Sequence, residues 1–258
     1  NCHSQNHAPL LSTVRDQQML FSPKGHLVFV SGLGNWTENG PPQHLLALHP
    51  RGGAPKETGY VGPRIRKPLG YMGGGAADEG RQAYSGLASS PDGEYLYFTH
   101  MVCWVVRKRV RIVDEGMPQR HAVYRVKWGD KDWGKPFVGA GKAGTDDNSF
   151  NWPRGLATDS KGNLYVCDNG NNRVMIFSPE GKLLGKFPVR APHKIAVHPK
   201  SGEIYVLSRR HNTFVKDTWT KHGPGGPPPE AGLTKFSAFE PGGECRKLAE
   251  IDGQDRNP

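Results

Sequence analysis

Four short apolar runs separated by turn residues lie between Gly139 and Phe187, and this pattern constrains the fold more than any other feature of the chain. Residues 164–168 alternate in character from one position to the next, as in a strand that packs two faces differently. The segments 159–162 and 178–181 supply tight turns that contain glycine. One four-stranded sheet of this kind cannot bury both of its faces alone, so neighbouring sheets must stack on it.

Such neighbours are present, because the strand–turn–strand pattern recurs at residues 194–206, at 85–98 and, in a weaker copy, at 19–30. Further strands follow these copies at residues 44–49, 122–128 and 233–240. The sequence therefore predicts an all-β fold, a β-propeller. An N-terminal extension covers residues 1–16, and blades are predicted at about 17–60, 84–139, 153–187 and 192–251.

The best-preserved blade resembles the NHL repeat. The matching elements are Phe150-Asn151 with Pro153, Gly155-Leu156-Ala157, Gly162 to Val166, and Asp168 to Arg173. The resemblance is strongest over Gly139–Phe187 and weaker over 17–138 and 192–251. It implies a ring of about six blades, so four visible blades would be part of a larger propeller.

The end of the sequence agrees with an incomplete ring. Asn257-Pro258 resembles Asn151-Trp152-Pro153, the lead into the third blade. We therefore expect the remaining blades to come from the same chain or from another one. The alternative is a four-bladed ring in which residues 1–16 supply a closing outer strand.

The connections between strands differ in length in a regular way. The first-to-second and third-to-fourth turns of the blades are short. Long connections are predicted at residues 33–43, 61–83, 102–121 and 210–232, and 61–83 and 210–232 carry no periodic apolar run. In a propeller these long connections lie on one face, the top face, and long loops gather where function is placed.

The chain carries a net charge of +10. Arginines cluster in the predicted top-face loops, and we single out Arg107, Arg109, Arg209 and Arg210. A basic surface favours an anionic partner, which could be a nucleic acid, an acidic glycan or a negatively charged protein. The alternative is that the charge only keeps a repeat protein soluble. The resemblance keeps RNA binding open, since some NHL propellers bind RNA.

The residue entering each innermost strand lines the mouth of the central channel. Alignment of the blades puts Gln17, Ser85, Arg154 and His193 there. Amidating lyases with NHL-like repeats hold zinc with histidines from several blades, and here only His193 matches. Lactonase-like propellers hold calcium with oxygen ligands, and none of these four residues is a carboxylate. We therefore expect a binding platform, with a metal-dependent enzyme as the alternative.

No other cofactor is evident. Asp168 and Arg173 are expected to hold the repeat's own turn, with turn amides donating to the aspartate. The four cysteines form no C-x-x-C pair. Asn1-Cys2-His3 would complete a haem-attachment motif only if a Cys-x pair preceded it. No apolar run is long enough to span a membrane, and the resemblance favours an extracytoplasmic protein.

Overall fold

The computed structural model describes residues 19–30, 43–52, 59–66, 81–84, 86–99, 101–106, 109–112, 121–209 and 231–252. Within these ranges the strands form four antiparallel four-stranded sheets and one three-stranded sheet. The prediction of an all-β fold with four propeller blades is thereby confirmed, whereas a ring of about six blades stays a prediction. No helix in the described part of the chain has the length and hydropathy needed to cross a membrane.

Each blade is one four-stranded sheet. Blade one contains β1 (Leu20–Phe21), β2 (Leu27–Val30), β3 (Gln43–Leu48) and β4 (Tyr60–Arg66). Blade two contains β6 (Leu87–Ser89), β7 (Tyr95–Thr99), β10 (His121–Lys127) and β11 (Pro136–Gly141). Blade three contains β12 (Pro153–Thr158), β13 (Leu164–Asp168), β14 (Arg173–Phe177) and β15 (Leu183–Pro188), with the 3-10 turn η1 (Asn169–Asn171). Blade four contains β16 (Pro192–Val197), β17 (Ile204–Arg209), β18 (Ala231–Phe236) and β19 (Lys247–Asp252).

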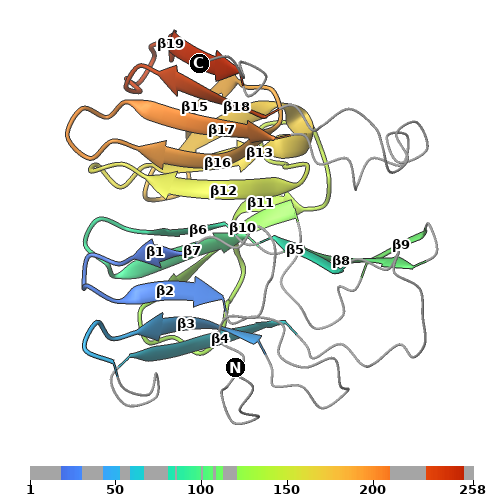
Figure 1. Ribbon diagram of the computed structural model, residues 1–258, viewed down its shortest axis with the longest axis vertical. Coiled ribbons are helices and arrows are strands. Elements are labelled where there is room, and N and C mark those ends of the chain that lie inside the picture. The colour runs from blue at the N-terminus through green and yellow to red at the C-terminus, as the bar shows by residue number, and fades with distance from the viewer. Residues whose placement is uncertain are drawn as a thin grey trace, which may run out of the picture.

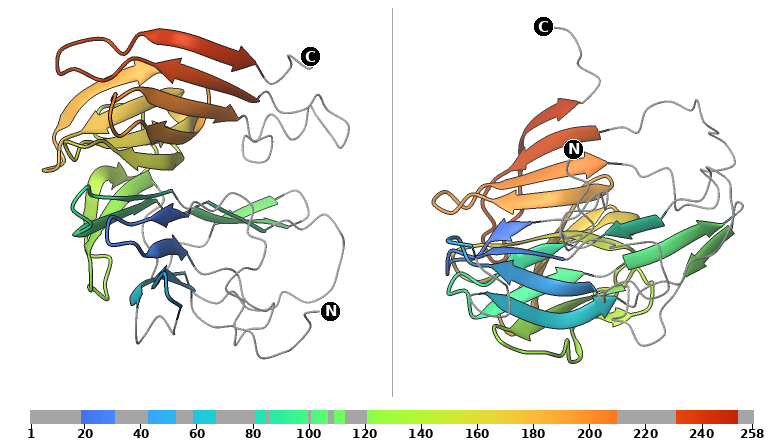
Figure 2. Two further views of the ribbon diagram at one scale, coloured as in Figure 1. Left: turned by 60° about the vertical axis from the view of Figure 1, so that its left-hand side comes forward. Right: turned by 60° about the horizontal axis from the view of Figure 1, so that its bottom comes forward.

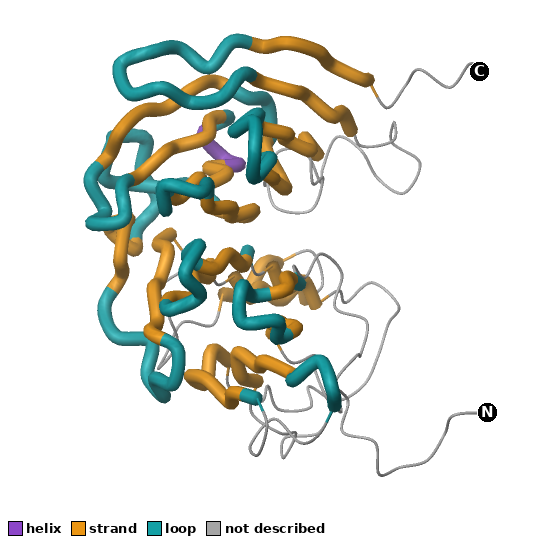
Figure 3. The backbone as a smooth tube through the Cα atoms, turned by 90° about the vertical axis from the view of Figure 1, so that its left-hand side faces the viewer, coloured by secondary structure: helices purple, strands orange, loops and turns teal. Residues whose placement is uncertain are grey.

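The blades follow one another along an arc, with blade one at one end and blade four at the other (Figures 1 and 3). The innermost strands β1, β6, β12 and β16 contact one another in this order. Two glycines permit this close approach. A Cβ on Gly86 would lie 1.9 Å from the carbonyl oxygen of Arg154, and a Cβ on Gly155 would lie 2.8 Å from that of His193. The inner strands therefore meet backbone to backbone.

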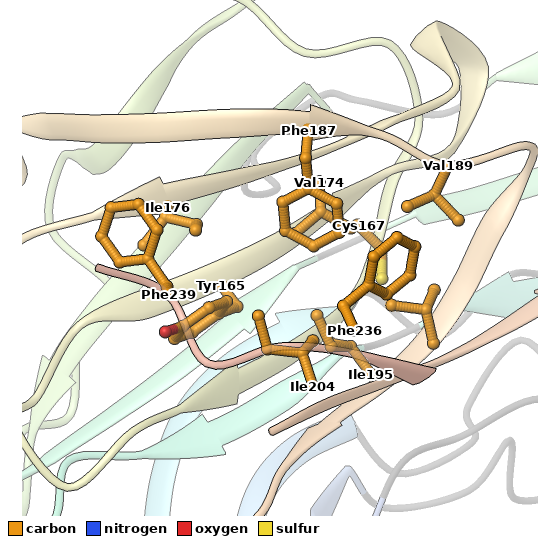
Figure 4. Close-up of a cluster of buried hydrophobic side chains, with 11 residues drawn as sticks. Tyr165, Cys167, Val174, Ile176, Phe187, Val189, Ile195, Ile204, Phe236 and Phe239 are labelled. Atoms are coloured by element: carbon orange, nitrogen blue, oxygen red, sulfur yellow. The ribbon is translucent and has the colours of Figure 1, made fainter. Parts of the chain in front are cut away.

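Buried side chains fill the space between successive blades. We call the face of a blade turned toward the next blade its forward face, and the opposite one its rear face. The forward face of blade three packs on the rear face of blade four (Figure 4). The forward members are Tyr165, Cys167, Val174, Ile176 and Phe187, and the rear members are Ile195, Ile204, Val206 and Phe236.

The same face-to-face packing joins the other blades. The forward face of blade two meets the rear face of blade three through Ala88, Tyr97, Val123, Leu156, Leu164, Val166 and Met175. Blade one meets blade two through Val28, Leu45, Ala47, Tyr60, Leu87, Leu96 and Phe98. The alternation read in residues 164–168 is explained, since Leu164 and Val166 face blade two while Tyr165 and Cys167 face blade four. Cys167 is fully buried, as expected for a small core residue.

Two of the predicted long connections contain strands. Residues 60–66 form β4 and pair with β3, so blade one extends further than predicted. Strands β5 (Arg81–Tyr84), β8 (Met101–Val106) and β9 (Arg109–Ile112) form the three-stranded sheet, and β8 and β9 project beyond the blades (Figure 2). The long connections predicted at 61–83 and 102–121 therefore contain strands in these parts. Apolar and β-branched residues in Met101–Val106 explain the strand.

Candidate functional site

Two backbone corners with the same design introduce the inner strands of blades three and four. Trp152 has φ of 57° and Ala191 has φ of 43°, both in the left-handed region that residues with a side chain seldom adopt. Each is followed by a proline and then by the predicted mouth residue, which gives Trp152-Pro153-Arg154 and Ala191-Pro192-His193. Strained backbone kept at equivalent places is typical of sites that position particular side chains.

The two corners bring Arg154 and His193 together. One terminal guanidinium nitrogen of Arg154, Nη1, lies 3.2 Å from Nδ1 of His193. Both residues are buried, with exposed fractions of 4% and 3%. They stand where β12 and β16 begin, which is the end of the blades on the side of β5, β8 and β9 (Figure 1). We call this end of the blades the entry end.

Hydrogen bonds from neighbouring elements hold both corners. The side chain of Asn172 accepts from the Ala191 N–H at 2.9 Å, and the side-chain amide of Asn169 donates to the Pro192 carbonyl at 2.9 Å. These two asparagines belong to or adjoin the η1 turn of blade three. The position of His193 in blade four is therefore set by blade three.

The corner at Trp152 is held by blade two. The Trp152 N–H donates to Nδ1 of His121 at 3.2 Å, and the two rings meet edge to face with centroids 5.0 Å apart. The hydroxyl of Thr99 donates to the Arg154 carbonyl at 3.1 Å. His121 and Thr99 were not predicted as site residues. The only feature that marks them is their position, since His121 begins β10 and Thr99 ends β7 at the entry end.

The other predicted site residues are not brought into this contact. Gln17, Ser85, Arg107 and Arg210 lie outside the described residues. Arg109 begins β9, where it pairs with Val106 of β8. Arg209 ends β17 and pairs with Ala231 of β18. Of the eight predicted residues, the structure thus joins Arg154 and His193.

Asp168 and Arg173 form a separate network at the entry end of blade three. The fully buried Asp168 carboxylate accepts from the Asn151 N–H at 2.7 Å, from the Asn171 side chain at 2.7 Å and from Arg173 Nε at 2.8 Å. Burial raises the pKa of this carboxyl, and the three hydrogen bonds partly offset that rise. The predicted turn-amide donors were wrong, because the Gly170 N–H donates to the Asn151 carbonyl.

The guanidinium of Arg173 continues this network into the segment before β12. It donates to the backbone carbonyls of Thr145, Asp146 and Ser149 at 2.7–2.9 Å. All the nitrogens of the guanidinium are thereby directed at the protein itself. Asp168 and Arg173 therefore stabilise the blade and are not available to hold a ligand.

Zinc and calcium sites in proteins need three or more ligating side chains close together. The described residues include no group of three or more His, Cys, Asp or Glu side chains arranged to hold an ion. Burial raises the pKa of the Cys167 thiol far above its usual range, so this thiol is not reactive near neutral pH.

The third blade matches a known repeat family. The NHL repeat matches residues 150–177. RING finger protein nhl-1 of Caenorhabditis elegans is 39% identical over 54 residues, which are 21% of this chain and 6% of that protein. Protein brain tumor of Drosophila melanogaster is 30% identical over 77 residues, which are 27% of this chain and 7% of that protein. The matched region thus spans a small part of these relatives.

Solved structures of propeller proteins resemble the chain at low sequence identity. A gluconolactonase from Xanthomonas campestris has a TM-score of 0.42 and 16% identity, covering 73% of this chain and 52% of that one. A streptogramin B lyase has a TM-score of 0.40 and 15% identity, covering 89% of this chain and 53% of that one.

Proposed function

We propose that this chain, which carries an NHL repeat in its third blade, is a binding module that recognises a negatively charged ligand at its entry end. The observation that carries the proposal is the contact between Arg154 and His193 at the beginning of two adjacent inner strands. Guanidinium groups stay charged at all physiological pH values, and their donors match carboxylate, sulfate and phosphate groups.

The surroundings of this pair suit recognition. Trp152 stands two residues before Arg154 and is half-buried, and its ring meets the ring of His121 edge to face. Binding sites commonly combine an apolar wall with a few convergent polar groups. The net charge of +10 adds a long-range attraction for anions. A sulfated glycan, a nucleic acid and an acidic protein segment share this chemistry, and the test separates them.

The test compares two arginines at opposite ends of the blades. Arg154 lies at the entry end, whereas Arg125 donates to the carbonyl of Pro179 in a turn at the other end. The variants Arg154→Gln and Arg125→Gln remove the same charge. Binding is followed by fluorescence anisotropy with three labelled probes, namely a heparin-derived oligosaccharide, a single-stranded RNA and a polyglutamate peptide.

We expect one probe to bind, and its affinity to fall about 10-fold or more in Arg154→Gln, since a hydrogen bond to a charged group contributes about 1.5–3 kcal/mol. Arg125→Gln should give only a small loss that vanishes at higher salt. Arg154→Lys, which keeps the charge but not the planar donors, should fall between them. Melting curves establish that the variants are folded. Equal losses for Arg154→Gln and Arg125→Gln, or no binding of any probe, would contradict the proposal.

The cellular location of this activity stays a prediction. An extracytoplasmic protein would meet glycans and other exported proteins, which suits the oligosaccharide and peptide probes. Binding of the RNA probe alone would instead favour the RNA-binding alternative.

A further inference from the structure

The η1 turn of blade three is bonded to both corners of the candidate site. On one side, the Gly170 N–H donates to the carbonyl of Asn151 at 2.7 Å, directly before the Trp152 corner. On the other side, the Asn169 side chain donates to the Pro192 carbonyl at 2.9 Å. One short turn therefore connects the backbone segments that introduce the inner strands of two adjacent blades.

The contact of η1 with the first corner is a close one. A Cβ on Gly170 would lie 2.7 Å from the Asn151 carbonyl oxygen and 2.7 Å from the Cγ atom of its side chain. Non-bonded heavy atoms of this kind pack at about 3.5–4.0 Å. A side chain at position 170 would therefore push η1 away from the backbone that precedes Trp152.

Asn172 contacts the second corner at two points. Its backbone carbonyl accepts from the Val189 N–H at 3.0 Å, and its side-chain oxygen accepts from the Ala191 N–H at 2.9 Å. Asn172 itself has φ of 54° and ψ of 45°, which is the left-handed conformation. Asparagine is one of the few residues with a side chain that visits this conformation routinely. Asparagine thus supplies both the backbone conformation and the side-chain acceptor that this contact uses.

The second corner depends on support of this kind. Ala191 has φ of 43°, and a residue with a side chain keeps such a conformation only where the surrounding structure holds it. Two positions later, Nδ1 of His193 lies 3.2 Å from Nη1 of Arg154. Arginine has no acceptor, so the guanidinium donates and the imidazole accepts. A shift of the corner would alter this contact, because hydrogen bonds weaken steeply when their geometry is distorted.

We propose that η1 is the positioning element of the ligand site and that Asn172 is its principal positioning residue. This inference rests on the proposed function. Through its hydrogen bonds to the backbone of blade four, Asn172 fixes His193 against Arg154 and thereby sets the affinity for the ligand. Gly170 does the same for the first corner by allowing η1 to approach it.

The test separates positioning from stability. Asn172→Gly keeps the left-handed backbone, which glycine adopts readily, and removes the side-chain acceptor. Asn148→Gly is the matched control at an exposed position. Both changes are made in the parent chain and in His193→Ala. Affinity for the labelled heparin-derived oligosaccharide, RNA and polyglutamate probes is measured by fluorescence anisotropy, and thermal denaturation gives the stability of each variant.

We expect Asn172→Gly to weaken binding of the probe about 5-fold in the parent chain, which is the order of effect of one hydrogen bond. In His193→Ala the same change should leave the affinity unaltered, because the asparagine acts through His193. The change in melting temperature should be similar in both backgrounds, so the two readouts distinguish positioning from folding. Asn148→Gly should leave the affinity unaltered in both.

Gly170→Ala tests the contact of η1 with the first corner. The added methyl group presses on Asn151, so the affinity should fall in the parent chain. The same change should have no further effect in Arg154→Gln, in which the side chain introduced by this corner is already altered.

Two results would overturn the inference while the proposed function stands. The first is an equal loss of affinity from Asn172→Gly in the parent chain and in His193→Ala. The second is unaltered affinity in Asn172→Gly or in Gly170→Ala, although Arg154→Gln still weakens binding. Absence of binding to all three probes would instead contradict the proposed function and this inference together.

Discussion

At the residue scale, the ion pair of Asp168 and Arg173 holds the entry end of blade three together. Its hydrogen-bond partners come from the segment before the inner strand and from the η1 turn. One carboxylate and one guanidinium thereby satisfy backbone and side-chain groups that a buried blade end would otherwise leave without partners. Asp168 and Arg173 therefore stabilise the entry end of blade three.

Removal of the Asp168 carboxylate should therefore be costly. We expect Asp168→Ala to lower the free energy of unfolding by about 3 kcal/mol, because it leaves a largely buried guanidinium without its nearest counter-charge. Asp147→Ala is the control, since Asp147 is 51% exposed and lies 3.8 Å from the same guanidinium. Its effect should be within about 1 kcal/mol. Equal changes in urea denaturation would contradict this role of Asp168.

The contact of Arg154 with His193 could be predicted at the residue scale, because both follow a proline in aligned repeats and adjacent blades put aligned residues side by side. The contribution of His121 could not be predicted from the sequence. It enters through a hydrogen bond to Trp152 from 31 positions away in the sequence. No local pattern in the sequence records such a long-range contact.

At the scale of the element, the tight turns of the blades follow the predicted chemistry. Gly162 ends the turn between β12 and β13 with φ of 83°, and its N–H donates to the Asp159 carbonyl at 3.1 Å. The turn between β14 and β15 has Gly181 in the corresponding role, with φ of 88°. Glycine is favoured because other residues rarely adopt this conformation.

The variant Gly162→Val should lower the free energy of unfolding by at least about 2 kcal/mol. A β-branched residue is strongly disfavoured at positive φ, and its Cβ would lie 3.2 Å from Pro179 Cγ. Gly162→Asn should cost less, because asparagine tolerates the left-handed conformation. Thermal denaturation that ranks the two variants equally would show that backbone conformation does not govern this turn.

Two turns share the motif Ser-Pro-acid-Gly, and their acids make stability depend on pH. Hydrogen bonds from Ser90 and Ser178 lower the pKa values of Asp92 and Glu180. A carboxyl with a lowered folded-state pKa stabilises the protein above its unfolded pKa of about 4, and this contribution is lost as the pH falls. The melting temperature should therefore decrease as the pH falls below about 5.

The double variant Asp92→Asn, Glu180→Gln should show a weaker dependence of melting temperature on pH over that range. The comparison is made between each protein's values at about pH 6 and about pH 3, so that any general loss of stability cancels. Identical slopes for the two proteins would exclude these turns as a source of the pH dependence.

At the scale of the whole molecule, the blades were predictable because turn glycines and alternating strands repeat along the chain. The small sheet of β5, β8 and β9 was not, since β5 is separated from its partner β8 by the first two strands of blade two. Its pairing depends on a non-local contact within a connection of irregular sequence.

The central claim is that the ligand is held at the entry end. Hydrogen–deuterium exchange, measured with and without the bound probe, tests this claim most directly. We expect slower exchange in residues 151–156 and 191–195, which contain Arg154 and His193. The turns at residues 159–163 and 198–203, at the opposite end of the same blades, should exchange at an unchanged rate. Protection of those turns, with no change at residues 151–156 and 191–195, would contradict the account.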